Sequence, residues 1–165
     1  MRIGVVGDTH NQLGNVERIV GLFDEAGVER IVHTGDITQP SVLEKFARLE
    51  RPLVGVYGNN DEHTRDLLSE HASTFGMDLV DPPRVLDWAE RRILVVHDPE
   101  LHALPHPATT DGIDLVLHGH THRYRQETVD GTLFFNPGEC AGFLAGRNAV
   151  GVVDLVSLDA TLLRF

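Results

Sequence analysis

The chain has 165 residues, 41% hydrophobic and 24% charged, a balance typical of one globular domain. Its formal net charge of −11 argues against an extended nucleic-acid surface, because such a surface needs clustered basic residues. Cys140 is the only cysteine, which excludes an intrachain disulfide and favours a cytoplasmic location. No apolar stretch has the length of a signal peptide or a transmembrane helix, so we expect no membrane association.

The first third of the chain predicts alternating strands and helices. Short apolar runs rich in Val and Ile predict buried parallel strands, and apolar residues at helical spacing predict the helices between them. The strands are predicted at 2–6, 29–34 and 53–57, and the helices at 14–26 and 41–49. Right-handed crossovers would place the carboxyl ends of the three strands side by side.

The rest of the chain predicts one more helix and then mainly β-structure. We predict a helix at 62–75, a strand at 114–118, and hairpins formed by 84–88 with 92–96, by 123–135, and by 149–156 with 160–165. Residues 99–112 are rich in Pro, His and Thr and predict an irregular loop, which we expect to shape the substrate site together with 60–66. Since there is no internal repeat or linker, we expect a single domain over residues 1–165.

Potential metal ligands stand in five places along the chain, most of them at the end of a predicted strand. They are Asp8 and His10 in GDTH, Asp36 in GDIT, Asn59 in GNND, His97 in VVHD, and His120 and His122 in GHTH. Because functional sites of open α/β sheets lie at the carboxyl ends of the strands, these loops can converge on one edge. A single cluster of this kind is common by chance, but the ordered set predicts a metal site.

The types and number of these side chains indicate which ions they suit. Mixed carboxylate, imidazole and amide ligands favour manganese, iron, zinc, nickel or cobalt over calcium. Seven ligands exceed what one ion needs, whereas two ions that share one carboxylate would use them all. We therefore expect two divalent transition-metal ions, with manganese favoured. A glycine precedes four of the ligands, where a sharp turn needs either a positive φ or close backbone approach; these are Gly7, Gly35, Gly58 and Gly119.

The order of these motifs resembles the calcineurin-like metallophosphoesterase superfamily, in which DxH, GDxx, GNxD/E, H and GHxH follow one another. The resemblance covers residues 3 to about 139 and includes Asn136-Pro137-Gly138, which matches an NPG motif of the small bacterial and archaeal members. It implies an α/β sandwich in which two packed mixed β-sheets are flanked by helices. In length the chain is similar to the single-domain phosphodiesterase branch.

The resemblance also implies a role for each ligand. It assigns three ligands to each metal and one to both: Asp8, His10 and His122 for the first, Asn59, His97 and His120 for the second, and Asp36 as the bridge. A water between the ions would ionise near neutral pH, and the metal-bridging hydroxide would attack the phosphorus of a small phosphodiester. No covalent intermediate with the enzyme is needed.

Asn60 is a departure from the family pattern. Many members have a histidine there, placed to protonate the leaving group, and the loss of a general acid costs about 10²–10⁴-fold. The departure disfavours phosphomonoesters with poor leaving groups and agrees with the phosphodiesterase branch. Asp61 keeps the acidic position, for catalysis or as a cap of a helix from about Glu62. The candidate catalytic residues are Asp36, Asn59, Asn60 and Asp61.

Other histidines and Cys140 lie close to these motifs. His33 and His118 stand at strand ends, where we expect a satisfied buried histidine and a residue that orients a ligand. His102 and His106 lie on the 99–112 loop, either as solvated side chains or as contacts of the substrate. For Cys140 we expect a buried, unreactive thiol.

Three other functions are the alternatives to a phosphodiesterase. The first is a protein-binding scaffold, because a eukaryotic retromer subunit resembles these small enzymes but lacks a full ligand set. The second is a phosphomonoesterase that acts on activated esters. The third, a metallo-β-lactamase-type hydrolase, requires HxHxDH, whereas His122 is followed by Arg123 and Tyr124. Small members of the resembling family often pair, so a homodimer is also possible.

Overall fold

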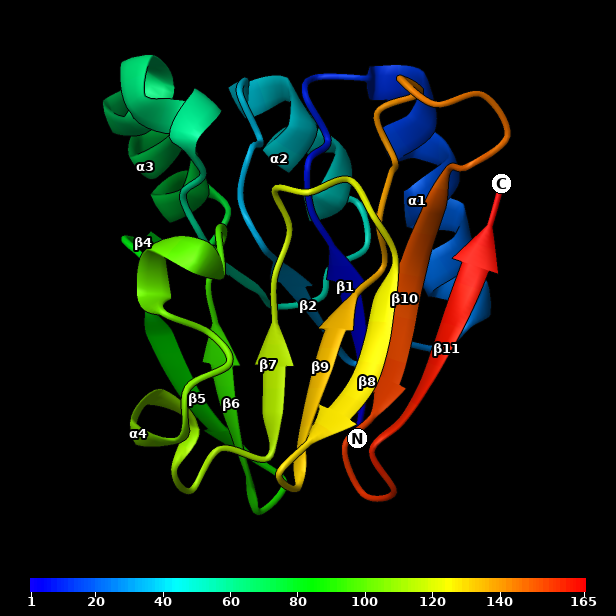
Figure 1. Cartoon of the computed structure of the whole chain (residues 1–165). Helices are drawn as coiled ribbons and strands as arrows, with labels where there is room; N and C mark the ends of the chain where they lie inside the picture. The colour runs from blue at the N-terminus through cyan, green and yellow to red at the C-terminus, as the bar shows by residue number, and fades with distance from the viewer.

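The computed structural model describes the backbone of residues 1–165 and every side chain except those of residues 107 and 108. Two β-sheets stack face to face, and three helices, α1, α2 and α3, cover the outer face of one of them (Figure 1). The expected α/β fold with two packed mixed sheets is therefore confirmed. No helix among the described residues is both long and apolar enough to cross a membrane.

The first sheet has six strands in the order β11-β10-β1-β2-β3-β4. The strands are β1 (Arg2–Val6), β2 (Arg30–His33), β3 (Leu53–Val56), β4 (Asp78–Val80), β10 (Ala149–Asp154) and β11 (Asp159–Arg164). β1 to β4 pair in parallel, whereas β10 pairs antiparallel with both β1 and β11. Sequence analysis missed β4, because three residues are too few to show a periodic pattern.

The second sheet has five strands in the order β5-β6-β7-β9-β8. The strands are β5 (Arg84–Trp88), β6 (Arg91–Val95), β7 (Leu115–Leu117), β8 (Arg125–Val129) and β9 (Thr132–Asn136). The predicted hairpins are present as the antiparallel pairs β5–β6, β8–β9 and β10–β11. Asp130 and Gly131, at the turn between β8 and β9, both have a positive φ, of 50° and 86°. Two-residue turns with this geometry match the twist of a hairpin.

The three long helices follow the prediction with one shift, and the segment 99–112, expected to be an irregular loop, contains a 3-10 turn and a short helix. They are α1 (Leu13–Glu25), α2 (Pro40–Ala47) and α3 (Arg65–Thr74), with short 3-10 turns η1 (Asn59–Thr64) and η2 (Glu100–His102) and a short helix α4 (Pro107–Thr110). The helix expected at 62–75 begins instead as the 3-10 turn η1. In this turn the Asp61 carboxylate accepts the backbone N–H of Gly58 at 2.7 Å. The expected capping role of Asp61 is therefore present, but the turn that it caps begins at Asn59 and not near Glu62.

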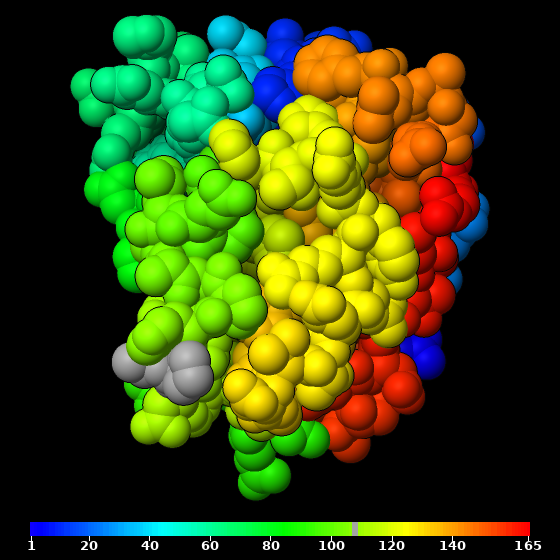
Figure 2. Space-filling model, viewed as in Figure 1, coloured from blue at the N-terminus to red at the C-terminus, as the bar shows by residue number. Residues whose placement is uncertain are grey.

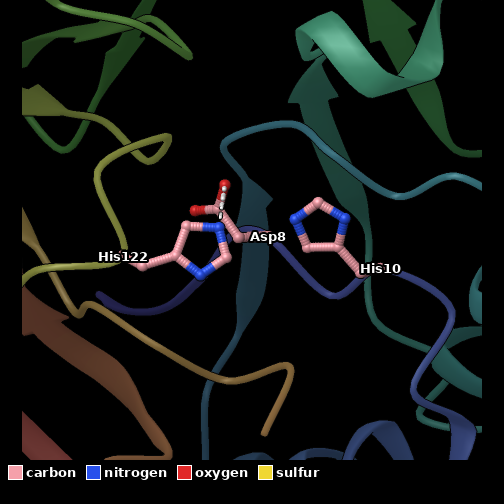
Figure 3. A group of neighbouring side chains, drawn as sticks. All are labelled: Asp8, His10 and His122. Atoms are coloured by element: carbon pink, nitrogen blue, oxygen red, sulfur yellow. Dashed lines mark ion pairs between the residues drawn. The ribbon is translucent and has the colours of Figure 1, made fainter. Parts of the chain in front are cut away.

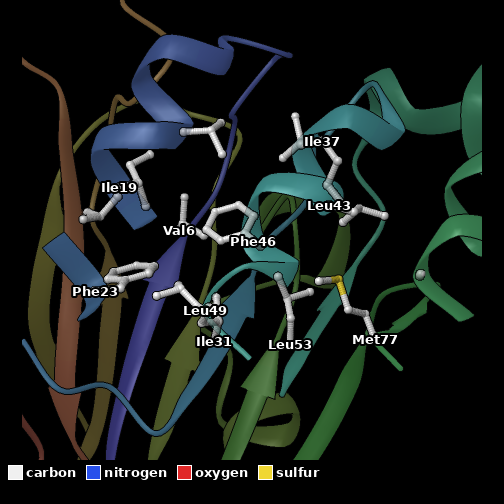
Figure 4. Close-up of a cluster of buried hydrophobic side chains, with 14 of the residues drawn as sticks. Val6, Ile19, Phe23, Ile31, Ile37, Leu43, Phe46, Leu49, Leu53 and Met77 are labelled. Atoms are coloured by element: carbon white, nitrogen blue, oxygen red, sulfur yellow. The ribbon is translucent and has the colours of Figure 1, made fainter. Parts of the chain in front are cut away.

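Hydrophobic side chains form a layer between the two sheets and a second layer under the helices. The first includes Ile3, Val5, Val32, Ile93, Leu115 and Phe135, and the second includes Val6, Ile19, Phe23, Leu43 and Phe46 (Figure 4). Burial of each such side chain contributes about 1.5–3 kcal/mol to the free energy of unfolding. These two layers fix the strand ends, and so they fix the loops that follow them.

One part of the segment from 99 to 113 packs on the second sheet, and another part lies beside the predicted ligands. Leu104 and Ile113 are buried against Val116 and Phe134 on the outer face of the second sheet. Only the beginning of the segment, at Leu101 and His102, lines a pocket next to the predicted ligands. Among the described side chains of 99–112, the structure places these two beside the predicted ligands, while the side chains of residues 107 and 108 lie outside the described residues; that 99–112 shapes the substrate site stays a prediction.

Candidate metal centre

Loops at the carboxyl ends of strands from both sheets bring the predicted ligands to one edge of the sandwich. In the first sheet, β1, β2 and β3 lead into the loops that carry Asp8, Asp36 and Asn59. In the second sheet, β6 and β7 lead into the loops that carry His97 and His120. Two overlapping groups have ligand atoms within 4.8 Å of one another: Asp8, His10 and His122, and Asp8, Asp36 and His97. These two groups hold five of the seven predicted ligands, and Asn59 Oδ1 joins the remaining two, Asn59 and His120, to them, at 3.0 Å from His97 Nε2 and 3.1 Å from His120 Nδ1.

Five of the seven ligand residues adopt the left-handed backbone conformation that side chains other than glycine rarely adopt. Their φ angles are 54° at Asp8, 43° at His10, 58° at Asp36, 67° at His120 and 54° at His122. Each such residue costs about 1–3 kcal/mol, so the surrounding fold must hold it in place. Strained residues are common at functional sites, so five of them among the predicted ligands agree with a functional site here.

The sequence offered two reasons for the glycines before the ligands, a positive φ or close backbone approach. Close approach is the reason at most of them. Of the four, only Gly35 has a positive φ, of 105°. At Gly58 a Cβ atom would collide with the backbone and carboxylate of Asp36, and at Gly119 it would lie 2.7 Å from Asp8 Oδ2. These glycines therefore leave room for the two carboxylates.

The first ligand group lies on the loops after β1 and β7 (Figure 3). His122 Nε2 lies 3.7 Å from Asp8 Oδ1, and His10 Nε2 lies 3.5 Å from Asp36 Oδ2. The rings of His10 and His122 stack with their centroids 5.3 Å apart. His10 Nε2 is buried and has no hydrogen-bond partner in the described part of the chain. A buried ring nitrogen that faces carboxylates fits a bound cation, because an unpaired polar atom is otherwise costly.

The second group gathers the ring nitrogens of two histidines around Asn59 Oδ1. His97 Nδ1 lies 2.9 Å from the carbonyl oxygen of Thr34, which can only accept, so Nδ1 carries the proton. His97 Nε2 lies 3.0 Å from Asn59 Oδ1. Burial acts to lower the pKa of His97, but hydrogen bonding and charge from Asp36 raise it, so the protonated ring can donate at Nε2. His120 Nδ1 lies 3.1 Å from the same oxygen of Asn59. Imidazole nitrogens and an amide oxygen are ligands that a transition-metal ion accepts.

Asp36 lies between the two groups and is held by Asn60. Its carboxylate accepts the backbone N–H of Asn60 at 2.9 Å and the side-chain amide of Asn60 at 2.7 Å. Burial acts to raise the pKa of Asp36, but hydrogen bonding and charge from His97 and the two Asn60 hydrogen bonds outweigh it and hold the pKa below its usual value. Burial raises the pKa of Asp8 to about 6 against the opposing charges of His97 and His122. A nearby cation would favour the ionised form of both carboxylates.

Asp61 ties two of the ligand loops together. It is fully buried, and its carboxylate accepts the backbone N–H groups of Gly58 at 2.7 Å, Asp36 at 2.9 Å and Thr38 at 2.7 Å. Burial raises the pKa of Asp61 above its usual value, although all three hydrogen bonds act to lower it. Each oxygen therefore contacts backbone, which gives Asp61 a positioning role in the metal-free protein.

Sequence reasoning missed the residues that orient the ligands. Glu139 Oε2 lies 2.6 Å from His122 Nδ1, and its other oxygen accepts the backbone N–H of Phe143 at 2.5 Å. Asn136, the first residue of the NPG motif, donates to the carbonyl oxygen of Gly119 at 3.0 Å and accepts from Gly138 at 2.8 Å. The acidic residue directly after NPG was the signal that could have revealed Glu139.

Two further histidines, His33 and His118, and the thiol of Cys140 are buried. His33 contacts Thr9 Oγ1 at 3.2 Å and Gly35 N at 3.2 Å, and burial lowers its pKa to about 3. Burial likewise lowers the pKa of His118 to about 4. Burial raises the pKa of the Cys140 thiol well above its usual value, and its sulfur donates to the Gly7 carbonyl at 2.9 Å. The thiol is therefore unreactive, as expected.

A pocket of about 250 Å³ opens beside the second ligand group. Asn59, His97 and His120 line it together with Tyr57 and Leu101. Its rim combines Leu101, whose side chain is 80% exposed, with charged side chains such as those of Glu62 and Arg65. The ligand cluster is therefore open to a small molecule from this side.

A sandwich of two mixed sheets whose strand-end loops gather Asp, His and Asn side chains is the arrangement of a phosphoesterase domain, here with candidate metal ligands. The chain belongs to the calcineurin-like phosphoesterase superfamily, whose domain model matches residues 1–158.

The chain is similar over nearly its whole length to archaeal members of that superfamily. It is 30% identical to the phosphodiesterase MJ0936 of Methanocaldococcus jannaschii over 154 residues, which are 93% of each chain. It is 28% identical to a probable metallophosphoesterase of Methanothermobacter thermautotrophicus over 144 residues, 84% of this chain and 76% of the relative. These relatives support a hydrolase of phosphate esters.

Solved structures agree with the fold. The structure of an archaeal phosphodiesterase superposes with a TM-score of 0.89 at 28% identity and covers 100% of both chains. The Escherichia coli phosphoesterase YfcE gives 0.73 at 19% identity, covering 99% of this chain and 98% of its own. Vps29 of Entamoeba histolytica gives 0.67 at 18% identity, covering 100% and 99%. The last two likenesses concern the fold alone.

Proposed function

We propose that this protein is a phosphodiesterase that depends on two divalent metal ions. The observation that carries the proposal is the position of Asp36 between two imidazoles. Its Oδ2 lies 3.5 Å from His10 Nε2, and its Oδ1 lies 3.5 Å from His97 Nε2. One carboxylate with an oxygen toward each ligand group suits a bridge between two ions.

In this proposal each ion has its own three ligands besides the shared Asp36. They are Asp8, His10 and His122 for the first ion and Asn59, His97 and His120 for the second. When bound, such ions lower the pKa of water and neutralise charge on the phosphate group. Manganese is the proposed ion, because it accepts this mixture of carboxylate, imidazole and amide.

The chain's own residues orient the ligands and admit the ester. Thr34 and Glu139 accept from the Nδ1 atoms of His97 and His122, which leaves each Nε2 free to bind an ion. Asn60 and Asp61 hold Asp36 and its loop. Because the amide of Asn60 is engaged with Asp36, it is not a donor of the imidazole type for a leaving group. The proposed substrates are therefore diesters and activated esters, which leave without strong acid assistance.

The test combines metal analysis with hydrolysis. The protein is reconstituted with manganese, its metal content is measured, and its hydrolysis of bis(p-nitrophenyl) phosphate is compared with that of p-nitrophenyl phosphate. We expect two ions per chain and a preference for the diester. Asp36→Asn should lose both ions and turnover, whereas the exposed Asp66→Asn on α3 should lose neither. One ion or none, or full turnover in Asp36→Asn, would contradict the proposal. A protein-binding scaffold with this fold predicts no hydrolysis at all.

A further inference from the structure

A second pocket of about 710 Å³ lies on the other side of the ligand cluster and carries three arginines. Arg123, Arg147 and Arg164 line it, and His122 forms its inner wall. They come from the segment before β8, from the 141–148 segment and from β11, which adjoin on the face seen in Figure 2 in yellow, orange and red.

These arginines are not neutralised by neighbouring carboxylates. Each is exposed, and none forms an ion pair with the side chains that the structure describes. Other arginines of the described surface are paired, as in Arg48 with Glu17, or stand singly without an ion pair, as does Arg51, whereas these three line one hollow. In a chain whose net charge is −11, three unpaired guanidinium groups around one hollow are a local reversal of charge.

The one carboxylate in this pocket does not cancel that charge. Glu139 is only 2% exposed, and its two oxygens contact His122 Nδ1 and the backbone N–H of Phe143. Its charge is therefore directed at the ligand histidine. The outward part of the pocket is left to the arginines, whose planar groups suit the oxygens of a phosphate.

The rim of the pocket is apolar and aromatic. Tyr124 is 50% exposed and Leu144 is 43% exposed, and both line the pocket. Phe143 is 61% exposed and stacks on His122, with the ring centroids 5.6 Å apart. Exposed aromatic rings beside guanidinium groups offer stacking as well as charge, which is the combination that a nucleotide uses.

We propose that the pocket lined by Arg123, Arg147 and Arg164 binds a second phosphate of the substrate. This inference rests on the proposed phosphodiesterase function and names its substrate class: a diester that also carries a terminal phosphate, such as a short 5′-phosphorylated oligonucleotide. His122 joins the two sites, because it is a candidate metal ligand and a wall of the pocket. The volume lies within the range of about 300–1,000 Å³ that small-molecule sites occupy.

The test compares binding of 5′-phosphorylated diadenylate with binding of unphosphorylated diadenylate to the manganese-loaded protein, by calorimetry. We expect the phosphorylated form to bind about tenfold more tightly or better, and this preference to weaken as salt is added. Replacing all three arginines by glutamine should abolish the preference, and Arg147→Gln alone should reduce it. Arg51→Gln, an exposed arginine outside the pocket, should keep it.

Hydrolysis of bis(p-nitrophenyl) phosphate, measured on the same preparations, reports on the proposed function separately. Equal affinity of the wild-type protein for the two diadenylates would overturn the phosphate subsite even if that ester is hydrolysed. Retention of the preference in the triple variant, or no detectable binding of the phosphorylated form, would also overturn it. If the ester is not hydrolysed, the proposed function fails, while the binding comparison still decides whether the arginines hold a phosphate.

Discussion

The side-chain amide of Asn60 donates a hydrogen bond of 2.7 Å to Asp36 Oδ2, while the backbone N–H of Asn60 donates to Asp36 Oδ1 at 2.9 Å. In the sequence, Asn60 departs from the motif of the family that the chain resembles, in which a histidine is expected at this position. In the structure it has a definite partner, the carboxylate that we propose as the bridge. The asparagine therefore fits a role in holding Asp36, and the proposed preference for diesters follows from the same contact.

Asn60→Ala should weaken metal binding. The change removes one of the two hydrogen bonds that orient Asp36 and hold its pKa low. Loss of a residue that orients a metal ligand costs about 10–100-fold in affinity. Manganese titration of the metal-free protein would measure it, with thermal unfolding as the check on folding. An affinity equal to that of the wild-type protein would show that Asn60 does not position Asp36.

Asn60→His should raise hydrolysis of p-nitrophenyl phosphate relative to bis(p-nitrophenyl) phosphate. An imidazole can give a proton to a leaving group, which an amide cannot do at neutral pH. Total activity should fall, because the new side chain gives up the amide contact with Asp36. The ratio of the two kcat/KM values is therefore the informative quantity. An unchanged ratio would remove the argument that a missing acid sets the ester preference.

Glu139→Gln should affect the first ion more than the second. Glu139 contacts His122 at 2.6 Å, whereas the second group is oriented through the carbonyl of Thr34. Removing the negative charge behind His122 should lower the affinity of one manganese ion by about 10–100-fold. The exposed Glu70→Gln on α3 is the control. Two ions weakened equally, or neither, would contradict the asymmetry.

The sequence predicted the parts of this molecule that depend on local patterns. Apolar runs that end in Gly-Asp or Gly-Asn place β1, β2 and β3 and the ligands after them, because strand burial and the turn are both local properties. The three hairpins followed from alternating residues and turn residues such as Asp130-Gly131. The strands of both sheets could therefore be predicted, with the exception of the three-residue β4, but not the order in which they pair.

Features that depend on contacts between distant residues could not be predicted. Nothing near Asp61 in the chain indicates that its carboxylate would accept backbone N–H groups from Asp36 and Thr38. Likewise, Glu139 meets His122 only after β9 returns alongside β7. The arginine pocket joins three segments whose arginines are scattered in the sequence. In each case the fold creates the relationship.

The buried His33 should lower the free energy of unfolding of the metal-free protein as the pH falls. Burial lowers its pKa to about 3, from 6.5 for the free side chain. Below about pH 6.5 the unfolded chain therefore binds a proton that the folded protein excludes, so stability is lost as the pH falls toward the folded pKa. Between about pH 7 and pH 5 this difference amounts to about 2 kcal/mol.

His33→Gln removes this proton uptake and should reduce the acid loss of stability by about that amount. The variant starts less stable near neutral pH, because it loses the packing of the ring on Phe46. Asp8 acts in the opposite direction, since its pKa is raised to about 6 and the folded protein gains a proton there. Asp8 is present in both proteins, so the difference between them isolates His33. Urea unfolding of both metal-free proteins at about pH 7 and pH 5 would measure this difference, and parallel losses would show that His33 does not titrate in this way.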